Sequence, residues 1–338
     1  MVATMLVADL PAICAMSDLL NAILKVVVLL VLLMIKLNSK NMMQHLTKIL
    51  VLFAIILLAS CGSELPSSVG EIEVHKDVLP VVVSPKRSIH LSVAGTLQDS
   101  IKDSEKYLIE ELTLSGEINA SDLRLIRDMA GSDYDLKSTA GKLKKLDLKD
   151  VSILKSMGEF MDLYLQDGYS GALRVTKSNV IPKSLFKKCR IISIILPKDT
   201  NEIEAEAFYS CYSLTSIVIS SSVTKIGNEA FHGCKAMFSL DIPDAVYSIG
   251  YGAFSGCDEL TSITIPISVI KLGEYAFSYC ENLISVVSNI QRPFDISGRV
   301  FNGINKNAIL TVPKGTKHAY ESKTGWKVNF KEIVESTE

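Results

Sequence analysis

Histidine and cysteine are the side chains most able to carry nucleophilic or metal chemistry, and the chain contains five and seven of them, respectively. The histidines (His45, His75, His90, His232 and His318) share no spacing that suits a metal site or a catalytic base. The sequence has no C-x-x-C pair, no G-x-S-x-G, no H-E-x-x-H and no phosphate-binding glycine loop. We therefore predict that the protein is not an enzyme and that it uses neither a metal nor another cofactor.

Five of the seven cysteines recur at a nearly constant interval, as Cys189, Cys211, Cys234, Cys257 and Cys280. If these residues stack in register, neighbours lie about 5 Å apart, which is within reach of a disulfide. Our preferred interpretation is that each one fills a buried corner as a small apolar residue. Disulfides between neighbours are the alternative, and counting free thiols distinguishes the two.

Phenylalanine marks the same interval. Steps of 22, 23, 23, 23 and 24 residues separate Phe186, Phe208, Phe231, Phe254, Phe277 and Phe301. A near-constant period of this length is typical of a solenoid, in which each repeat is one coil stacked on the next. One coil alone buries too little apolar surface to offset the ordering of its backbone, so neighbours must cover both of its faces.

Each repeat also contains a short run of alternating apolar residues, such as Ile263 and Ile265 before Pro266. This period of two predicts a strand, and proline ends it because proline cannot donate to a continuing ladder. After its own strand segment a repeat contains a glycine, which is Gly250 in the repeat before this one, and we interpret it as supplying a turn. Stacked coils of this kind predict an α/β-type solenoid with a parallel sheet, whose strands lie about 4.8 Å apart.

The full pattern, L-x-S-I-x-I-P-x-S-V-x-x-I-G-x-x-A-F-x-x-C, covers residues 180–303 and resembles the BspA-like leucine-rich repeat. That repeat is common in surface lipoproteins of Bacteroidetes-type bacteria. Residues 304–338 are assigned to a C-terminal cap, because 310–335 resemble the cap that ends many such arrays. Residues 88–179 are assigned to atypical N-terminal repeats, because the block from about 88 to 155 resembles the usual leader of such arrays. The resemblance implies a leucine-rich-repeat solenoid with atypical, helix-bearing N-terminal coils and a C-terminal cap.

Within residues 88–179, strands are predicted at 112–114 and 146–148, which start 34 residues apart. Helices are predicted at 97–110 and at 121–130, the second beginning at a cap formed by Ser121 or Asp122. In the C-terminal cap, the single tryptophan, Trp326, is expected to seal the last coil, with ligand binding as the alternative.

The N-terminal 87 residues carry export signals. Residues 42–60 have the layout of a secretory signal, and Leu58-Ala59-Ser60-Cys61 resembles the lipobox of bacterial lipoproteins, which makes Cys61 the lipidated residue. Residues 61–87 then read as the lipidated cysteine and a tether. Residues 1–41 are interpreted as a gene-model extension, with translation starting at Met34, Met42 or Met43, or else as an extra apolar segment. The alternative for Cys61 is a lone cysteine at the end of a transmembrane helix.

A candidate binding strip consists of the residues that flank the inward apolar residue of each repeat strand. Its members are Ser193 and Ile195, Ser216 and Val218, Ser239 and Asp241, Ser262 and Thr264, and Ser285 and Val287. Alternation along a strand predicts that they face outward and stack as two files. The plainer interpretation is a hydroxyl ladder that suits stacked strands; the functional one is a flat, weakly polar surface for a protein or glycan.

These features predict an exported, lipid-anchored binding protein. The family resemblance implies cell-surface adhesion to host proteins, other microbes or glycans. It also implies that the protein is an outer-membrane lipoprotein that faces outward. A periplasmic envelope structural or assembly protein is the first alternative, and a glycan-processing accessory protein is the second. A net charge of −2 without a basic tract argues against nucleic acid as a partner.

Overall fold

The chain divides into two compact units, Met1–Leu79 and Pro80–Glu338. The computed structural model describes residues 85–133, 135–164 and 170–337, all of which belong to the second unit. The predicted signal segment, the lipobox and Cys61 lie outside the described residues. In the described ranges, no helix is both long enough and apolar enough to cross a membrane.

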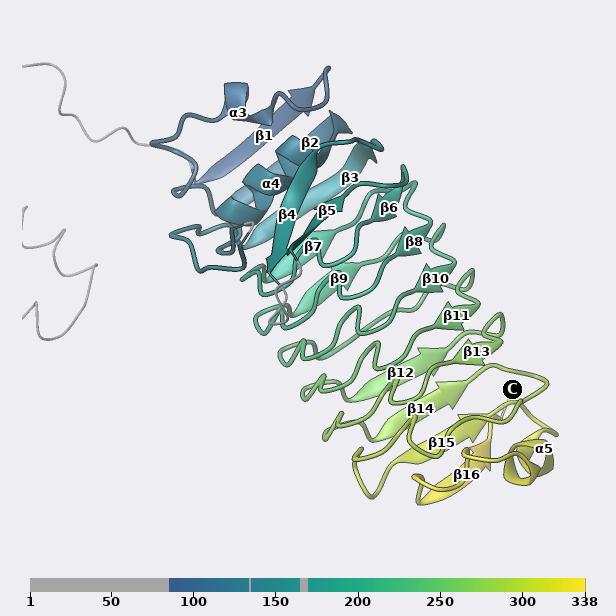
Figure 1. Ribbon diagram of the computed structural model, residues 1–338. Coiled ribbons are helices and arrows are strands. Elements are labelled where there is room, and N and C mark those ends of the chain that lie inside the picture. The colour runs from purple at the N-terminus through teal and green to yellow at the C-terminus, as the bar shows by residue number, and fades with distance from the viewer. Residues whose placement is uncertain (1–84, 134, 165–169, 338) are drawn as a thin grey trace, which may run out of the picture. The chain divides into compact units, whose positions relative to one another are not determined.

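The second unit is a stack of coils built mainly from short strands (Figure 1). The helices are α3 (Leu97–Ser100), α4 (Ala120–Met129) and α5 (Lys317–Ser322). The strands are β1 (Lys86–Leu91), β2 (Glu111–Ile118), β3 (Lys145–Ile153), β4 (Glu159–Tyr164), β5 (Ser170–Arg174), β6 (Val180–Ile181), β7 (Ser193–Ile195), β8 (Glu202–Ile203), β9 (Ser216–Val218), β10 (Lys225–Ile226), β11 (Ser248–Ile249), β12 (Ser262–Ile265), β13 (Lys271–Leu272), β14 (Ser285–Ser288), β15 (Ile309–Val312) and β16 (Glu332–Glu335).

The strands form two parallel ladders that run down the stack, as the solenoid prediction requires. The first ladder carries the predicted strip and consists of the sheet β1-β2-β3-β7-β9 followed by the sheet β12-β14-β15-β16. The second ladder is the sheet β6-β8-β10-β11-β13, which lies along another side of the solenoid (Figure 1). The antiparallel hairpin β4-β5 interrupts the chain between β3 and β6, and the weak pattern of that segment did not predict it.

The predicted phenylalanine ladder is confirmed. Successive rings from Phe186 to Phe301 stack with centroids 5.0–5.5 Å apart. All six rings are at most 1% exposed. The backbone locks the same register, because the Phe208 N–H donates to the Ala230 carbonyl at 2.7 Å, and Phe231 repeats the bond one coil later. Ring stacking and backbone bonds therefore join each coil to the next.

The interpretation of the repeat cysteines as buried residues is also confirmed, since all five are free and buried. The structure adds a role for the thiol. The Sγ of Cys211 donates to the carbonyl oxygen of Phe186, one coil earlier, at 2.9 Å, and the Sγ of Cys280 donates to that of Phe254 at 3.2 Å. Each thiol thus gives a second hydrogen bond to a carbonyl that already accepts a backbone N–H, inside an otherwise apolar corner.

Burial gives these thiols a pH signature. It raises the pKa of Cys189, Cys211 and Cys234 above the ordinary value, and a hydrogen bond with Cys280, followed by burial, does so for Cys257. Above about pH 9 the unfolded chain loses thiol protons that the folded chain keeps, so stability is full below that pH and falls above it. We expect a loss of about 1 kcal/mol per thiol by about pH 10. Urea unfolding over this pH range measures the loss. In Cys234→Ala the free energy of unfolding should fall less steeply with pH, by the contribution of one thiol. Identical pH dependences for the variant and the wild-type chain would contradict the assignment.

The interpretation that the repeat glycines supply a turn is wrong. Gly227, Gly250 and Gly273 do not have a positive φ; the left-handed residues stand two positions later, as in Glu229 (φ 53°) and Tyr275 (φ 61°). Instead, an added Cβ on any of the three glycines would lie 2.3–2.6 Å from backbone atoms of the preceding coil. Glycine is required there because two backbones approach too closely for a side chain.

The N-terminal coils are real but differ in detail from the prediction. Strands β2 and β3 pair in parallel with Leu112 opposite Leu146, as the 34-residue offset predicts. Helix α4 is capped by Asn119 rather than by Ser121, and Asp122 closes the capping box. The helix predicted at 97–110 is wrong: α3 ends at Ser100, because Ile101 turns to an extended conformation that buries its side chain.

Buried contacts fasten both ends of the repeat array. Arg127 on α4 is fully buried, and its guanidinium donates to the carbonyls of Ser184, Leu185 and Asp133, which ties α4 to the first standard coil. At the other end Trp326 is fully buried against the ring of Phe301 and donates to the Phe294 carbonyl at 2.8 Å. The expectation that Trp326 seals the last coil is therefore met, although strand β16 beyond it was not predicted.

Candidate interaction surface

The structure places the predicted strip on the first ladder, in two parallel files. Ser193 pairs with Ser216, and Ser262 pairs with Ser285, each as register partners on neighbouring strands. The second file runs beside the first, with Ile195 opposite Val218 and Thr264 opposite Val287. None of the ten predicted residues is buried. Eight of them flank a buried residue such as Ile263 and so point away from the core, whereas Ser239 and Asp241 flank the half-buried Leu240.

The five serine hydroxyls of the strip make no hydrogen bond to any described residue. Hydroxyls elsewhere in the repeats are used to join coils: those of Thr215, beside the strip, and Thr224, beside the second ladder, donate to carbonyls of the preceding coil at 3.0 and 3.1 Å. The strip serines therefore do not form a hydrogen-bonded ladder among themselves. Their donors and acceptors remain available to a partner.

The strip is interrupted in the third repeat. Residues 238–242 form no strand, so β9 and β12 are the facing edges of two separate sheets. Leu240 stands where the other repeats have a β-branched Ile or Val, and it is only half-buried. Together with Asp241, it lowers the local strand propensity. Ser239 and Asp241 are exposed at the break, beside Phe238, which is 56% exposed.

Except for Asp241, the charges lie at the ends of the strip rather than within it. On the N-terminal coils the serine file continues as Lys86, Glu111 and Lys145, in which Glu111 forms ion pairs of 2.9 and 3.0 Å with the two lysines. Hydrogen bonds from both lysines hold the pKa of Glu111 below its usual range. Between these coils and Glu332 on β16, Asp241 is the only charge in the two files of described residues.

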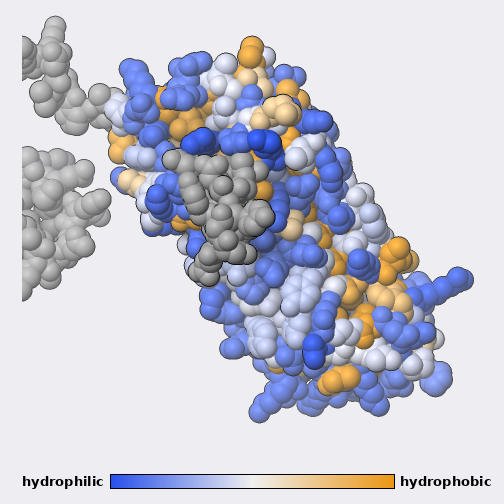
Figure 2. All heavy atoms as spheres, viewed as in Figure 1, coloured by the Kyte–Doolittle hydropathy of each residue, from blue (hydrophilic) through white to orange (hydrophobic). Residues whose placement is uncertain are grey.

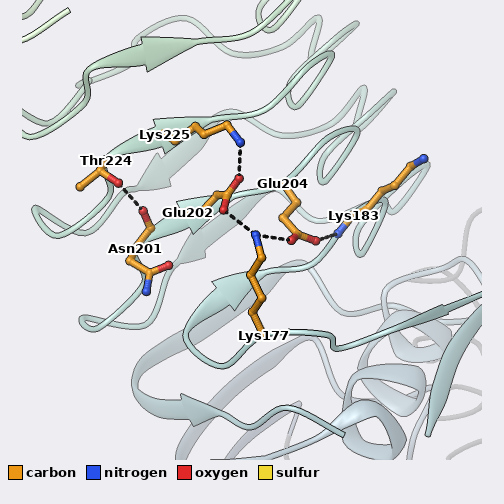
Figure 3. Close-up of polar contacts among 7 residues, drawn as sticks. All are labelled: Lys177, Lys183, Asn201, Glu202, Glu204, Thr224 and Lys225. Atoms are coloured by element: carbon orange, nitrogen blue, oxygen red, sulfur yellow. Dashed lines mark hydrogen bonds and ion pairs between the residues drawn. The ribbon is translucent and has the colours of Figure 1, made fainter. Parts of the chain in front are cut away.

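The second ladder carries a charge network that is paired within itself (Figure 3). The Glu202 carboxylate contacts the Nζ atoms of Lys225 at 2.7 Å and Lys177 at 3.1 Å, and Lys177 also reaches Glu204 at 3.6 Å. Burial acts to raise the pKa of Glu202, but the two lysine hydrogen bonds outweigh it and the pKa is lowered. Because its charges neutralise one another, we interpret this network as joining coils rather than binding a ligand.

A second polar cluster lies on the N-terminal coils. Asp128 accepts hydrogen bonds from the Tyr107 hydroxyl at 2.9 Å and forms an ion pair of 3.0 Å with Lys106, beside a cavity of about 380 Å³. Hydrogen bonding to Asp128 raises the pKa of Lys106. No group of three or more potential metal ligands occurs within the described ranges.

The repeat geometry can now be compared with known proteins. The model of the BspA-type leucine-rich repeat region matches residues 178–320 in six copies. These residues are a BspA-type leucine-rich repeat region. The BspA-type repeats therefore include the first half of the C-terminal cap as well as the five units identified from the cysteines. Such regions are in general binding rather than catalytic modules, and their class points to protein partners.

Solved structures with similarity to the chain are themselves repeat proteins. A leucine-rich repeat protein of T. pallidum is 23% identical (TM-score 0.31; 44% of this chain and 60% of that one). One from Bacteroides ovatus is 24% identical (TM-score 0.35; 53% and 52%), and the pneumococcal vaccine antigen PcpA is 15% identical (TM-score 0.38; 68% and 68%). The chain thus spans less than two thirds of the first two proteins. No curated protein matches it.

The strip is longer in the structure than the sequence analysis predicted. Beyond Val287 its second file continues in register to Thr311 and Val334 on the cap. Toward the N-terminus it continues from Ile195 to Asp147 and Thr113. Thr113 and Asp147 each stand between two leucines, so the alternation that identified the repeat strands could have found them. The result is an extended, mostly uncharged face, which is suited to contact with a macromolecule.

Proposed function

We propose that the protein is an exported, lipid-anchored binding protein that uses the strip to hold a protein partner at the cell surface. The observation that carries the proposal is the pair of outward files: five serine hydroxyls without a partner among the described residues, next to a file of aliphatic and threonine side chains in which Asp241 is the one charge. A flat surface of this kind combines apolar contact with available hydrogen bonds, as the centres of protein interfaces do. The BspA-type repeat supports the surface location, because such proteins are typically surface-associated.

Replacing Ser216, Ser239 and Ser262 together with lysine is expected to abolish partner binding while the fold persists. Burying three lysine charges against an uncharged partner surface costs free energy, and the three charges on neighbouring coils also repel one another. Binding to intact host or microbial cells is the readout, and an unchanged melting temperature shows that the stack is intact. Serine-to-threonine changes at the same positions are the matched control. Full binding by the lysine variant would rule out the strip.

Protease treatment of intact cells tests the location. Digestion of the repeat region on intact cells supports outward display, whereas protection until lysis favours the periplasmic structural or assembly role. Cys61→Ser should prevent lipid labelling and release the protein from the membrane fraction, which separates the anchoring proposal from the binding proposal. A glycan-processing accessory role would instead require binding to envelope glycans that the strip variant loses.

A further inference from the structure

The fourth BspA-type repeat departs from its neighbours at two outward positions. Ile267 occupies the position held by Lys198, Ser221 and Asp244 in the preceding coils, and it is 59% exposed. Ile270 is 71% exposed and follows Tyr247 in its file, to whose carbonyl its N–H donates at 3.0 Å. The other repeats provide an internal reference, in which these turn positions are mostly polar.

The result is an apolar corner between the two ladders, made of Tyr247, Ile267 and Ile270. Figure 2 shows hydrophobic side chains gathered over the region of β11 and β13. The side chains of Ile267 and Ile270 do not contribute to the core. The buried residue of this turn is Val269, which lies between them. Exposed apolar patches rimmed by polar residues are typical of protein-binding sites.

A groove of about 440 Å³ adjoins this corner at the carboxyl ends of β12, β14 and β15. Ile267 forms part of its wall, and Val287 and Thr311 of the extended strip line it, so the groove is continuous with that strip. Asn289 and Gln291 also line it and are exposed. A side-chain amide offers both a donor and an acceptor, which matches the main-chain amides of an extended peptide.

The wall of the groove is held rigidly. The buried hydroxyl of Tyr320 on α5 donates to the carbonyl of Ile290 at 2.8 Å and pairs with the hydroxyl of Ser288 at 2.6 Å. These bonds fix the segment that carries Asn289 and Gln291 against the cap. A prearranged wall lowers the ordering cost of binding a flexible segment.

Asp244 supplies the charge preference. It is the only charged residue among those that line the groove, and its carboxylate makes no ion pair or hydrogen bond with any described residue. We propose that the corner and groove bind an extended segment of a partner protein in which an apolar side chain stands beside a lysine or arginine. The apolar side chain packs on Ile267 and Ile270, the cation pairs with Asp244, and the main chain bonds to Asn289 and Gln291. This inference rests on the proposed protein-binding function.

A random-peptide phage library selected on the full-length protein tests the inference, with the I267E/I270E variant as counter-selection. Enriched peptides should pair an aliphatic or aromatic residue with Lys or Arg. A synthetic peptide from the selection, followed by fluorescence polarisation, should bind the double variant at least about tenfold more weakly. D244N should weaken binding about threefold and remove most of its salt dependence. V328E, which alters an exposed valine of the cap that does not line the groove, is the matched control and should bind normally.

The outcomes separate this inference from the proposed function. No enriched motif, acidic peptides, or equal binding by I267E/I270E would overturn the groove, and the triple-lysine strip variant would still test the strip. Peptide binding that survives in the strip variant while whole-cell binding is lost supports both. A dimer in sedimentation velocity that I267E/I270E dissociates would assign the corner to a second copy of the chain and overturn the inference.

Discussion

Replacing Phe254 with alanine is expected to lower the free energy of unfolding by about 3–5 kcal/mol, because a buried aromatic side chain is lost and a cavity remains. Phe254 is fully buried, and its ring stacks on Phe231 at 5.2 Å and on Phe277 at 5.3 Å. The coils on either side are joined by backbone hydrogen bonds at this position, which restricts collapse into the cavity. Urea denaturation followed by circular dichroism measures the change.

Phe238→Ala is the matched control for this prediction. Both residues are phenylalanines of the third repeat, separated by 16 positions, but Phe238 is 56% exposed. We expect its replacement to cost less than about 1 kcal/mol. Equal losses for the two variants would mean that the stacked rings do not carry the stability of the array.

Gly273→Ala is expected to destabilise the array by about 3 kcal/mol, at the upper end of the usual cost of overpacking. The added Cβ would lie 2.3 Å from both the carbonyl carbon of Gly250 and the amide nitrogen of Tyr251. Backbone atoms cannot rotate away as a flexible side chain can, so the two coils must separate. That movement also stretches the 2.8 Å bond from the Gly273 N–H to the Ile249 carbonyl. The thermal midpoint of the purified variant measures the effect.

Gly298→Ala provides the comparison in the next coil. Its φ is not positive, and the nearest atom to an added Cβ is the Val328 Cγ2, at 4.0 Å. We expect a change within about 1 kcal/mol, and of either sign, because alanine also lowers the entropy of the unfolded chain. A large loss here, or none at Gly273, would contradict the close-approach explanation.

The sequence was sufficient to predict the parts of the fold that depend on period. Phe231, Phe254 and their equivalents had to stack, because a constant interval in a solenoid places equivalent residues one above another. The same reasoning predicted the buried cysteines and the outward direction of strip residues such as Ser216. It could not distinguish a glycine needed for a turn from one needed for the close approach of two backbones, because the interval between glycines in the sequence is the same in both cases.

The remaining differences arise where tertiary contacts override local pattern. The helix predicted at 97–110 stops at Ser100, because Ile101 takes an extended conformation that buries its side chain in the core. The groove beside β14 was not predicted either, because it depends on how Tyr320 of the cap holds Ile290. The unusual residues of the fourth repeat, Ile267 and Ile270, were visible in the sequence and could have been found by comparing outward positions between repeats.

The missing strand in the third repeat gives the solenoid an uneven resistance to bending. On the first ladder, no strand pairing joins β9 to β12, whereas β10, β11 and β13 remain paired on the second ladder and the phenylalanine rings stack without a gap. Opening the stack on the side of the strip therefore requires breaking fewer hydrogen bonds than opening it on the other side. We therefore expect the strip to bend more readily at residues 238–242 than elsewhere along the first ladder, because no strand pairing has to be broken there.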